Sequence, residues 1–215
     1  MKNWEKFEAR KEQEVKLIDP ISKLIVRTLG ADLEEFFPKT DGGRTKHIMD
    51  ALSLLGDSGL EQHFKVLSNK FTLGLKPKNG DFLRKEWLFD LHWFTDPGGY
   101  KLTRLPLVVE SEWRWTRKDD EKIPKDYYGE VKWDFQKLLV ANAELRLMIF
   151  RKRPDKPGEK PDETINDDLD RYFDEAIQGY KYLAKDSKFL FIAFDENIAP
   201  NAKGFHYILK IAKPS

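Results

Sequence analysis

Carboxylate side chains interrupt two apolar segments of the sequence, and they are the residues that could do chemistry. Asp90 lies within the apolar segment 87–94, while Glu110 and Glu112 lie near the end of the segment 105–113. An unpaired charge in such surroundings costs several kcal/mol. Because side chains alternate along a strand, Glu110 and Glu112 should point to the same face. If the two segments pair as a hairpin, Asp90 approaches the glutamates and three carboxylates come together.

Three carboxylates at such close range require a bound cation or raised pKa values. Hard divalent cations take oxygen ligands, and Mg2+ commonly uses one or two carboxylates together with water and substrate phosphate. A site of this kind activates water and neutralises charge on a phosphodiester. The plainer alternative is that Asp90 is hydrogen-bonded within the fold, while Glu110 and Glu112 line a solvated strand end.

The elements that must position these residues follow from the apolar pattern. Residues 1–65 are expected to be a helical N-terminal region, and residues 70–215 the core sheet with its helices, all in one domain. In the N-terminal region we expect a charged helical segment over 4–17, a helix from beyond Pro20 that stops at Gly30, a turn or loop over 31–46 and a helix over 46–55.

The remainder of the chain predicts a sheet with interspersed helices. Strands are expected first at 71–75, 87–94 and 105–113, separated by the turn sequences Lys78-Asn79-Gly80 and Asp96-Pro97-Gly98-Gly99. This order predicts an α/β fold with a mixed central sheet, whose apolar strands need helices on both faces. After the first three strands we expect a helix over 131–142, a strand at 145–150, a charged loop over 151–163, a helix over 165–180, and strands at 189–194 and 205–211.

Composition limits the classes of function. The chain has 38 Lys and Arg against 37 Asp and Glu, a net charge of +1, so any attraction to an anionic partner must come from a local patch. The absence of cysteine excludes disulfides, thiolate nucleophiles and iron–sulfur clusters. The charged segment Met1 to Lys16 lacks the apolar stretch of a signal peptide, and no segment is apolar enough to span a membrane. We therefore expect a soluble, cytoplasmic protein without a membrane partner.

Asp90, the segment Val108-Val109-Glu110-Ser111-Glu112-Trp113 and the segment Trp133 to Leu139 together resemble the PD-(D/E)XK nuclease superfamily. That family has a restriction endonuclease-like fold with an αβββαβ core, which agrees with the element order above. The resemblance implies that Asp90 is the first acid, that Glu110 is the second, and that Glu112 takes the position normally held by lysine.

The same resemblance implies an activity, a cofactor and partners. Asp90, Glu110 and Glu112 would bind Mg2+, for which Mn2+ can substitute, and the protein would cleave phosphodiester bonds as an endonuclease. DNA is the expected substrate. A homodimer is expected because cleavage of both strands needs two sites.

Glu112 in place of lysine is a departure from the family pattern. Lys137 is the candidate to supply the missing cation, because in some relatives the lysine has moved to the following helix, and an ammonium group there could orient water or stabilise developing charge. The alternative is that Lys137 is a solvated residue paired with Asp134 at i,i+3. An acid from the first core helix joins the metal in some relatives, for which Glu35 and Glu61 are the candidates.

Other sequence features carry weaker hypotheses. Four scattered histidines make a zinc hydrolase improbable, and no nucleotide-binding glycine motif or GxSxG occurs. His92 shares strand parity with Asp90, although a structural role suits it better. One mixed aromatic and basic cluster could contact nucleic acid or belong to the core: Trp113, Arg114, Trp115, Arg117 and Lys118. A second basic cluster, Arg151-Lys152-Arg153, could be a DNA clamp or a solvated loop. The two literal Pro-Asp pairs, Pro154-Asp155 and Pro161-Asp162, lie in the charged loop and do not lead into a strand followed by the nuclease motif.

Two further functions stay open. The change at Glu112 and the balanced charge favour a nuclease-like module that binds or assembles without catalysis. A protein that holds a small cationic ligand with its acids is the third hypothesis.

Overall fold

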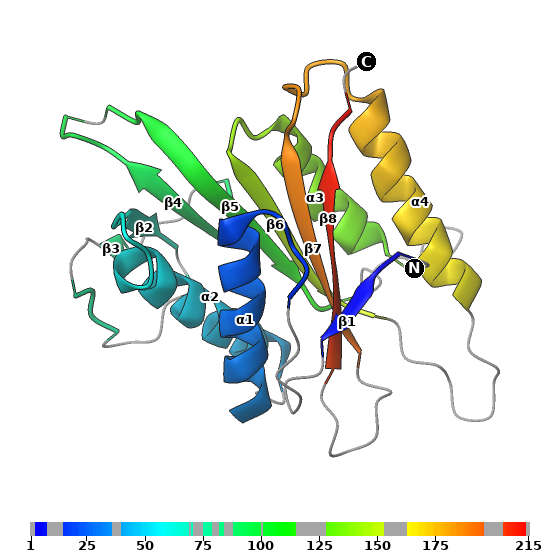
Figure 1. Cartoon of the computed structure of the whole chain (residues 1–215), viewed down its shortest axis with the longest axis horizontal. Helices are drawn as coiled ribbons and strands as arrows, with labels where there is room; N and C mark the ends of the chain where they lie inside the picture. The colour runs from blue at the N-terminus through cyan, green and yellow to red at the C-terminus, as the bar shows by residue number, and fades with distance from the viewer. Residues whose placement is uncertain are drawn as a thin grey trace.

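In the computed structural model of the chain, the described residues form an eight-stranded mixed sheet in the order β1-β8-β7-β6-β5-β4-β2-β3 (Figure 1). The structure describes residues 3–7, 15–35, 40–68, 70, 75–78, 82–83, 88–99, 101–114, 128–152, 163–195 and 204–213. The expected α/β class with a mixed sheet is confirmed. The strands are β1 (Glu5–Phe7), β2 (Lys65–Leu67), β3 (Phe82–Leu83), β4 (Leu91–Thr95), β5 (Arg104–Glu112), β6 (Leu145–Arg151), β7 (Lys188–Asp195) and β8 (Gly204–Ile211).

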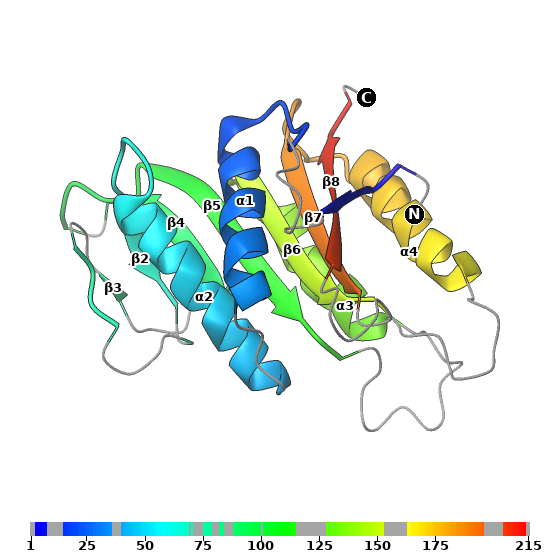
Figure 2. The same ribbon diagram turned by 60° about the horizontal axis from the view of Figure 1, so that its bottom comes forward.

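Helices cover both faces of the sheet, as the apolar strands require. Helices α1 (Pro20–Glu35) and α2 (Asp41–Ser58) lie on one face, and α3 (Gly129–Val140) and α4 (Glu163–Gly179) lie on the other (Figures 1 and 2). Strand β6 contributes side chains to the cores on both faces of the sheet. Leu147 packs into the core beneath α1 and α2, while Met148 packs into the core beneath α3 and α4. Among the described residues, no helix is long and apolar enough to cross a membrane.

Strand β5 lies where the sheet changes from antiparallel to parallel pairing. Its neighbour β4 runs antiparallel to it, with Leu91 opposite Val109, and β6 runs parallel to it on the other side. The turn expected at 96–99 is confirmed, because the Asp96 carboxylate accepts hydrogen bonds from backbone N–H groups beyond it and closes the β4–β5 hairpin. Continuing this register by one residue sets Asp90 opposite Glu110.

The chain near the N-terminus is extended, so the helix expected over 4–17 is wrong at its start. Residues Glu5–Phe7 pair with β8 as an antiparallel edge strand. Trp4 and Phe7 are three residues apart, which would place them on one face of a helix but puts them on opposite faces of extended chain. The structure buries Trp4 in the core of α3 and α4, and Phe7 in the core of α1 and α2.

The expected boundaries of the first two helices also need correction. Helix α1 continues through Gly30 to Glu35, because this glycine serves close approach and not termination: a Cβ there would lie 2.0 Å from Cε1 of Phe7. The cluster expected to form a turn at 41–43 is instead the first turn of α2, where Thr40 Oγ1 accepts a hydrogen bond from the N–H of Gly43. The N-terminal region is therefore not wholly helical, since it contributes β1 to the sheet.

The strands of the core agree more closely with expectation, except around Asp90. Strand β4 begins only at Leu91, so Asp90 precedes the strand and does not interrupt it. Its carbonyl accepts a hydrogen bond from Ser68 Oγ in place of a strand partner. Helix α3 and strands β5, β6, β7 and β8 fall close to their expected ranges, whereas the strand expected at 71–75 lies largely outside the described residues.

Candidate active site

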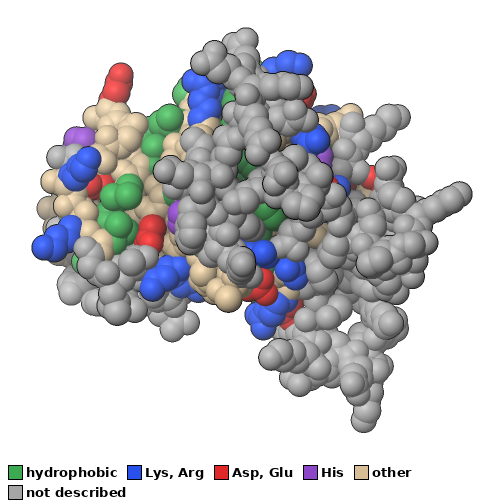
Figure 3. Space-filling model, turned by 90° about the horizontal axis from the view of Figure 1, so that it is seen from below, with side chains coloured by type: hydrophobic (Ala, Val, Ile, Leu, Met, Phe, Trp, Pro, Cys, Tyr) green, Lys and Arg blue, Asp and Glu red, His purple; other side chains and the backbone are tan. Residues whose placement is uncertain are grey.

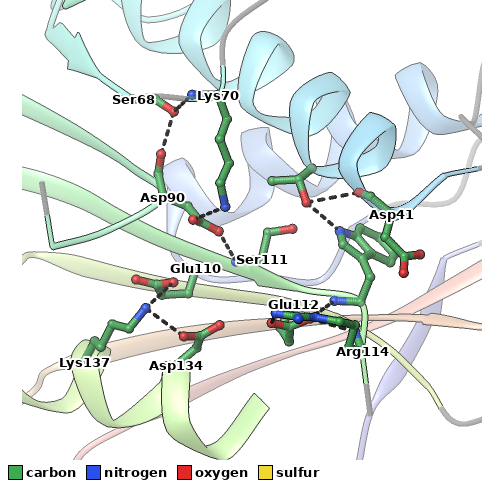
Figure 4. Close-up of polar contacts among 12 residues, drawn as sticks. Asp41, Ser68, Lys70, Asp90, Glu110, Ser111, Glu112, Arg114, Asp134 and Lys137 are labelled. Carbon is green, nitrogen blue, oxygen red and sulfur yellow. Dashed lines mark hydrogen bonds and ion pairs between the residues drawn. The ribbon is translucent and has the colours of Figure 1, made fainter. Parts of the chain in front are cut away.

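Asp90 is held at the start of β4 by contacts from two neighbouring segments (Figure 4). Its Oδ1 accepts a hydrogen bond from Lys70 Nζ, and its Oδ2 accepts one from the backbone N–H of Ser111 at 3.0 Å. Its carbonyl oxygen lies 2.5 Å from the Ser68 hydroxyl. These contacts tie Asp90 to the end of β2 and to β5, so the carboxylate lies beside that of Glu110.

Glu110 is the most deeply buried carboxylate of this group, with an exposed fraction of 1%. Its Oε2 accepts a hydrogen bond from Lys137 Nζ at 3.2 Å, while Oε1 is buried and no donor among the described residues reaches it. Burial raises the pKa of Glu110 to about 9, with further increases from the charges of Asp90 and Asp134. The site therefore disfavours a third negative charge unless more positive charge is brought in.

Lys137 connects β5 to helix α3. Its Nζ lies 3.2 Å from Glu110 Oε2 and 2.7 Å from Asp134 Oδ1. Burial by itself would lower the pKa of Lys137, but the hydrogen bond to Asp134 and the charge of Glu110 outweigh burial and raise it. The neighbouring Phe135 and Leu138 are buried in the core, which fixes the rotation of α3 and directs Lys137 toward the sheet. Lys137 thus forms the expected pair with Asp134 and also reaches the site.

Glu112 lies on the α3 side of β5 together with Glu110, but its carboxylate has other partners (Figure 4). Its Oε1 accepts hydrogen bonds from the backbone N–H groups of Trp113 at 2.9 Å and Arg114 at 2.7 Å, and the Arg114 guanidinium lies 3.3 Å away. Its charge still acts on the site, since burial raises the pKa of Asp134 and Glu112 adds to the increase.

No group of three or more His, Asp and Glu side chains in the described ranges of the chain is arranged to hold a metal ion. Asp90 and Glu110 come together as expected, but Glu112 does not join them as a third ligand. The pair nevertheless fits a hard divalent ion, because both donors are carboxylates and the buried Oε1 of Glu110 lacks a hydrogen-bond donor among the described residues. Asp90 and Glu110 are the residues that could hold such an ion.

Three residues of this site were not singled out as such from the sequence: Ser68, Lys70 and Asp134. The i,i+3 spacing of Asp134 and Lys137 indicated an ion pair but not its place beside β5. Lys70 gives no comparable signal, because its position depends on the pairing of the three-residue strand β2 with β4. That pairing is a long-range contact which local patterns do not encode.

The remaining candidates have structural surroundings or lie outside the described residues. His92 is buried between the rings of Phe89 and Phe94, and burial lowers its pKa to about 4. Trp113 is a core residue whose Nε1 donates to Thr45 Oγ1 at 3.1 Å. Glu61 is exposed. Arg151 forms an ion pair with Asp41, and Lys152 forms one with Asp195. The described residues do not include the remaining candidates, which are Trp115, Arg117, Lys118, Arg153, Pro154-Asp155, Pro161-Asp162 and the side chain of Glu35.

In comparisons with known proteins, no family model matches the chain, and no significant match is found among curated proteins or solved structures.

Proposed function

We propose that the protein is a metal-dependent nuclease of the PD-(D/E)XK type, with a restriction endonuclease-like fold, that cleaves DNA with Mg2+ or Mn2+. The observation that carries the proposal is the pair formed by Asp90, just before β4, and Glu110 of β5, with a lysine from the next helix on the buried glutamate. The order α2, β2, β4, β5, α3, β6 supports it, since this is an αβββαβ sequence with the two-residue strand β3 as an addition.

Each residue has a role that its contacts support. Asp90 and Glu110 would hold the ion, which when bound supplies charge neutralisation at the phosphate and activation of water. Lys137 holds Glu110 in place and keeps a positive charge at the site. For Glu112 to become a third ligand or a base, its carboxylate would have to leave Arg114 and two backbone N–H groups.

Isosteric substitution of the two acids tests this proposal. Supercoiled plasmid and oligonucleotide DNA are incubated with Mg2+ or Mn2+ and wild-type protein, Asp90→Asn or Glu110→Gln. Because either substitution removes a ligand, we expect cleavage to fall by at least about 100-fold in both. The matched control is Asp168→Asn, an exposed acid of α4 paired with Arg171, which should cleave like wild type. Unchanged cleavage in both site variants would exclude these residues as the active site.

A nuclease-like module without catalytic activity is the second candidate. The observation that favours it is that each of the three acids already has a cation from the chain itself: Lys70 on Asp90, Lys137 on Glu110 and Arg114 on Glu112. Calorimetric titration with Mg2+ separates the two functions. Binding of DNA without any metal binding supports the module, whereas metal binding that Asp90→Asn abolishes supports the nuclease.

The homodimer and the cytoplasmic location belong to the same proposal. Light scattering coupled to size-exclusion chromatography tests the first, because a dimer would double the 25.3 kDa mass of the chain. The second is motivated by the cysteine-free composition and is tested by localising a tagged protein in cells.

A further inference from the structure

Lys70 is a second lysine at the carboxylate pair, and it comes from a different element than Lys137. It follows β2, whereas Lys137 belongs to α3, and the two reach different acids (Figure 4). The segment that carries Lys70 is attached to Asp90 at two points: Ser68 Oγ lies 2.5 Å from the Asp90 carbonyl, and Lys70 Nζ contacts the Asp90 carboxylate. The backbone N–H of Lys70 also donates to Ser68 Oγ at 3.1 Å. Lys70 is thus built into the site.

The surroundings of the two lysines differ in a way that separates their roles. Lys137 lies between two carboxylates, those of Glu110 and Asp134, and its side chain is 30% exposed. Lys70 contacts one carboxylate among the described residues, that of Asp90, and its side chain is 39% exposed. Lys70 is therefore the lysine that can leave its partner more easily and that a solvent-borne anion can reach.

A divalent ion and the Lys70 ammonium cannot both lie close to the Asp90 carboxylate without repulsion. The Coulomb repulsion between a divalent ion and an ammonium group is twice that between two unit charges at the same distance. An ion bound to Asp90 would therefore displace the ammonium group. The flexible stem of lysine lets the displaced group move to an anion nearby while Ser68 keeps the backbone in place.

We propose that Lys70 is an exchangeable counter-ion: it neutralises Asp90 in the metal-free protein, and when a divalent ion takes Asp90 it moves to a phosphate of the substrate backbone. This inference rests on the proposed nuclease function and deepens it. It makes metal binding and phosphate binding cooperative, because the ion that occupies Asp90 also frees the cation that holds the substrate.

The test measures metal and phosphodiester binding separately in the full chain. Lys70→Met removes the charge at similar length. In calorimetric titration with MnCl2 and no DNA, Lys70→Met should bind Mn2+ more tightly than wild type, by about tenfold, because one competing cation is lost. In fluorescence anisotropy with a labelled oligonucleotide and Ca2+, the same variant should bind more weakly, and the slope of log K against log salt should shrink by about one.

Opposite changes in the two affinities are the signature of exchange, since a purely structural role would weaken both. Lys70→Arg keeps the charge and should resemble wild type, Lys181→Met replaces an exposed lysine beyond α4 as the control, and Lys70→Gln replaces Lys70→Met if that variant fails to fold. Weaker Mn2+ binding by Lys70→Met, or no change in either affinity, overturns the inference. If wild type itself binds no Mn2+, the proposed nuclease function fails as well; if Asp90→Asn abolishes Mn2+ binding while Lys70→Met behaves as wild type, only the exchange fails.

Discussion

The carboxylate of Glu110 is destabilised in its charged form both by burial and by neighbouring negative charges. Its side chain is 1% exposed, and the charges of Asp90 and Asp134 act on it. Among the described residues its lysine partner is Lys137, which also pairs with Asp134. Burial and the two like charges together outweigh Lys137, so the protonated form of Glu110 is favoured in the metal-free fold. An arrangement of this kind costs stability at alkaline pH and is relieved when a cation binds.

This conflict predicts a pH dependence of stability in chelator-treated protein. The pKa of Glu110 is about 9 in the folded state, against an ordinary value of 4.5. At pH values between these two, the folded state therefore retains a proton on Glu110 that the unfolded state has lost. The free energy of unfolding must therefore decrease as pH rises through this window. Glu110→Gln cannot ionise, so it should lose less stability than wild type between pH 6 and pH 9, by at least about 1 kcal/mol.

Urea denaturation at a series of pH values measures this difference, with Asp168→Asn as the control that should follow wild type. Parallel pH profiles for wild type and Glu110→Gln would show that Glu110 is ionised at no cost in the fold. Such a result would remove the electrostatic reason to place a cation beside it.

The sequence predicts Asp90, Glu110 and Lys137 as members of the site, and it misses Ser68 and Lys70, which long-range contacts place there. Asp90 and Glu110 could be brought together from the sequence because the turn at 96–99 implies a hairpin. Glu112 was expected as a ligand because strand parity gives the face of a side chain but not its rotamer, and the N–H groups of Trp113 and Arg114 capture its carboxylate. The site residues near the end of β2 could not be predicted because their position depends on strand pairing.

At the scale of elements, α2 packs against β4, the strand that Asp90 directly precedes. The link is Trp93, which is fully buried, stacks on Phe64 at a centroid distance of 5.8 Å and donates from Nε1 to the carbonyl of Leu52 at 3.1 Å. Gly56 of α2 lies against the Trp93 indole, where a Cβ would approach Nε1 to 2.6 Å. The absence of a side chain at Gly56 thus permits the contact between helix and strand.

Two glycine substitutions in α2 should therefore differ in their effect on stability. Gly56→Ala pushes against a buried indole and should lower the free energy of unfolding by about 2 kcal/mol, as overpacking of a core does. Gly42→Ala places its Cβ in open space in the first turn of the same helix and should be neutral or stabilising by up to about 1 kcal/mol, since alanine favours helix. Denaturation in guanidinium chloride compares them. Equal effects would mean that Trp93 moves aside without cost.

Helix and strand boundaries show what periodicity alone can give. The strands β5 to β8 were predictable because each contains a short run of consecutive apolar residues. Gly30 was expected to end α1, yet its neighbour in space is Phe7, which is distant in sequence. A glycine at a helix end and a glycine at a tertiary contact look the same in a local window, so only the packing distinguishes them.

At the scale of the whole molecule, the chain has 38 basic and 37 acidic residues, and side chains of opposite charge lie near one another on its surface (Figure 3). Figure 3 shows Lys and Arg side chains next to Asp and Glu side chains on the face seen from below, with hydrophobic side chains among them. Around the site the cations are likewise paired with acids, as Lys70, Lys137 and Arg114 are. A nuclease with this surface would gain phosphate contacts by releasing its own ion pairs, which agrees with the proposed exchange at Lys70.

The first and last strands pair with each other at the edge of the sheet away from the site. Strand β1 pairs with β8, and Trp4 just before it packs on α4 and the strands beneath. Its ring lies 6.0 Å from that of Phe150 and 6.1 Å from that of Phe191, and its Nε1 donates to Asp170 Oδ1 at 2.9 Å. Three strands, β8, β7 and β6, separate β1 from β5, so this contact should stabilise the fold without shaping the carboxylate pair.

Trp4→Ala tests whether stability and the site are separable in this way. Removal of a buried indole should lower the free energy of unfolding by about 3 kcal/mol. Tyr182→Ala, at an aromatic residue that is 88% exposed, should change it by no more than about 0.5 kcal/mol. Below the melting temperature of Trp4→Ala, both variants should keep the Mn2+ affinity of wild type. If Trp4→Ala lost Mn2+ binding while still folded, the effect of docking the first strand would have to reach across the sheet to β5. The site would then depend on the whole sheet instead of the β4–β5 hairpin and α3.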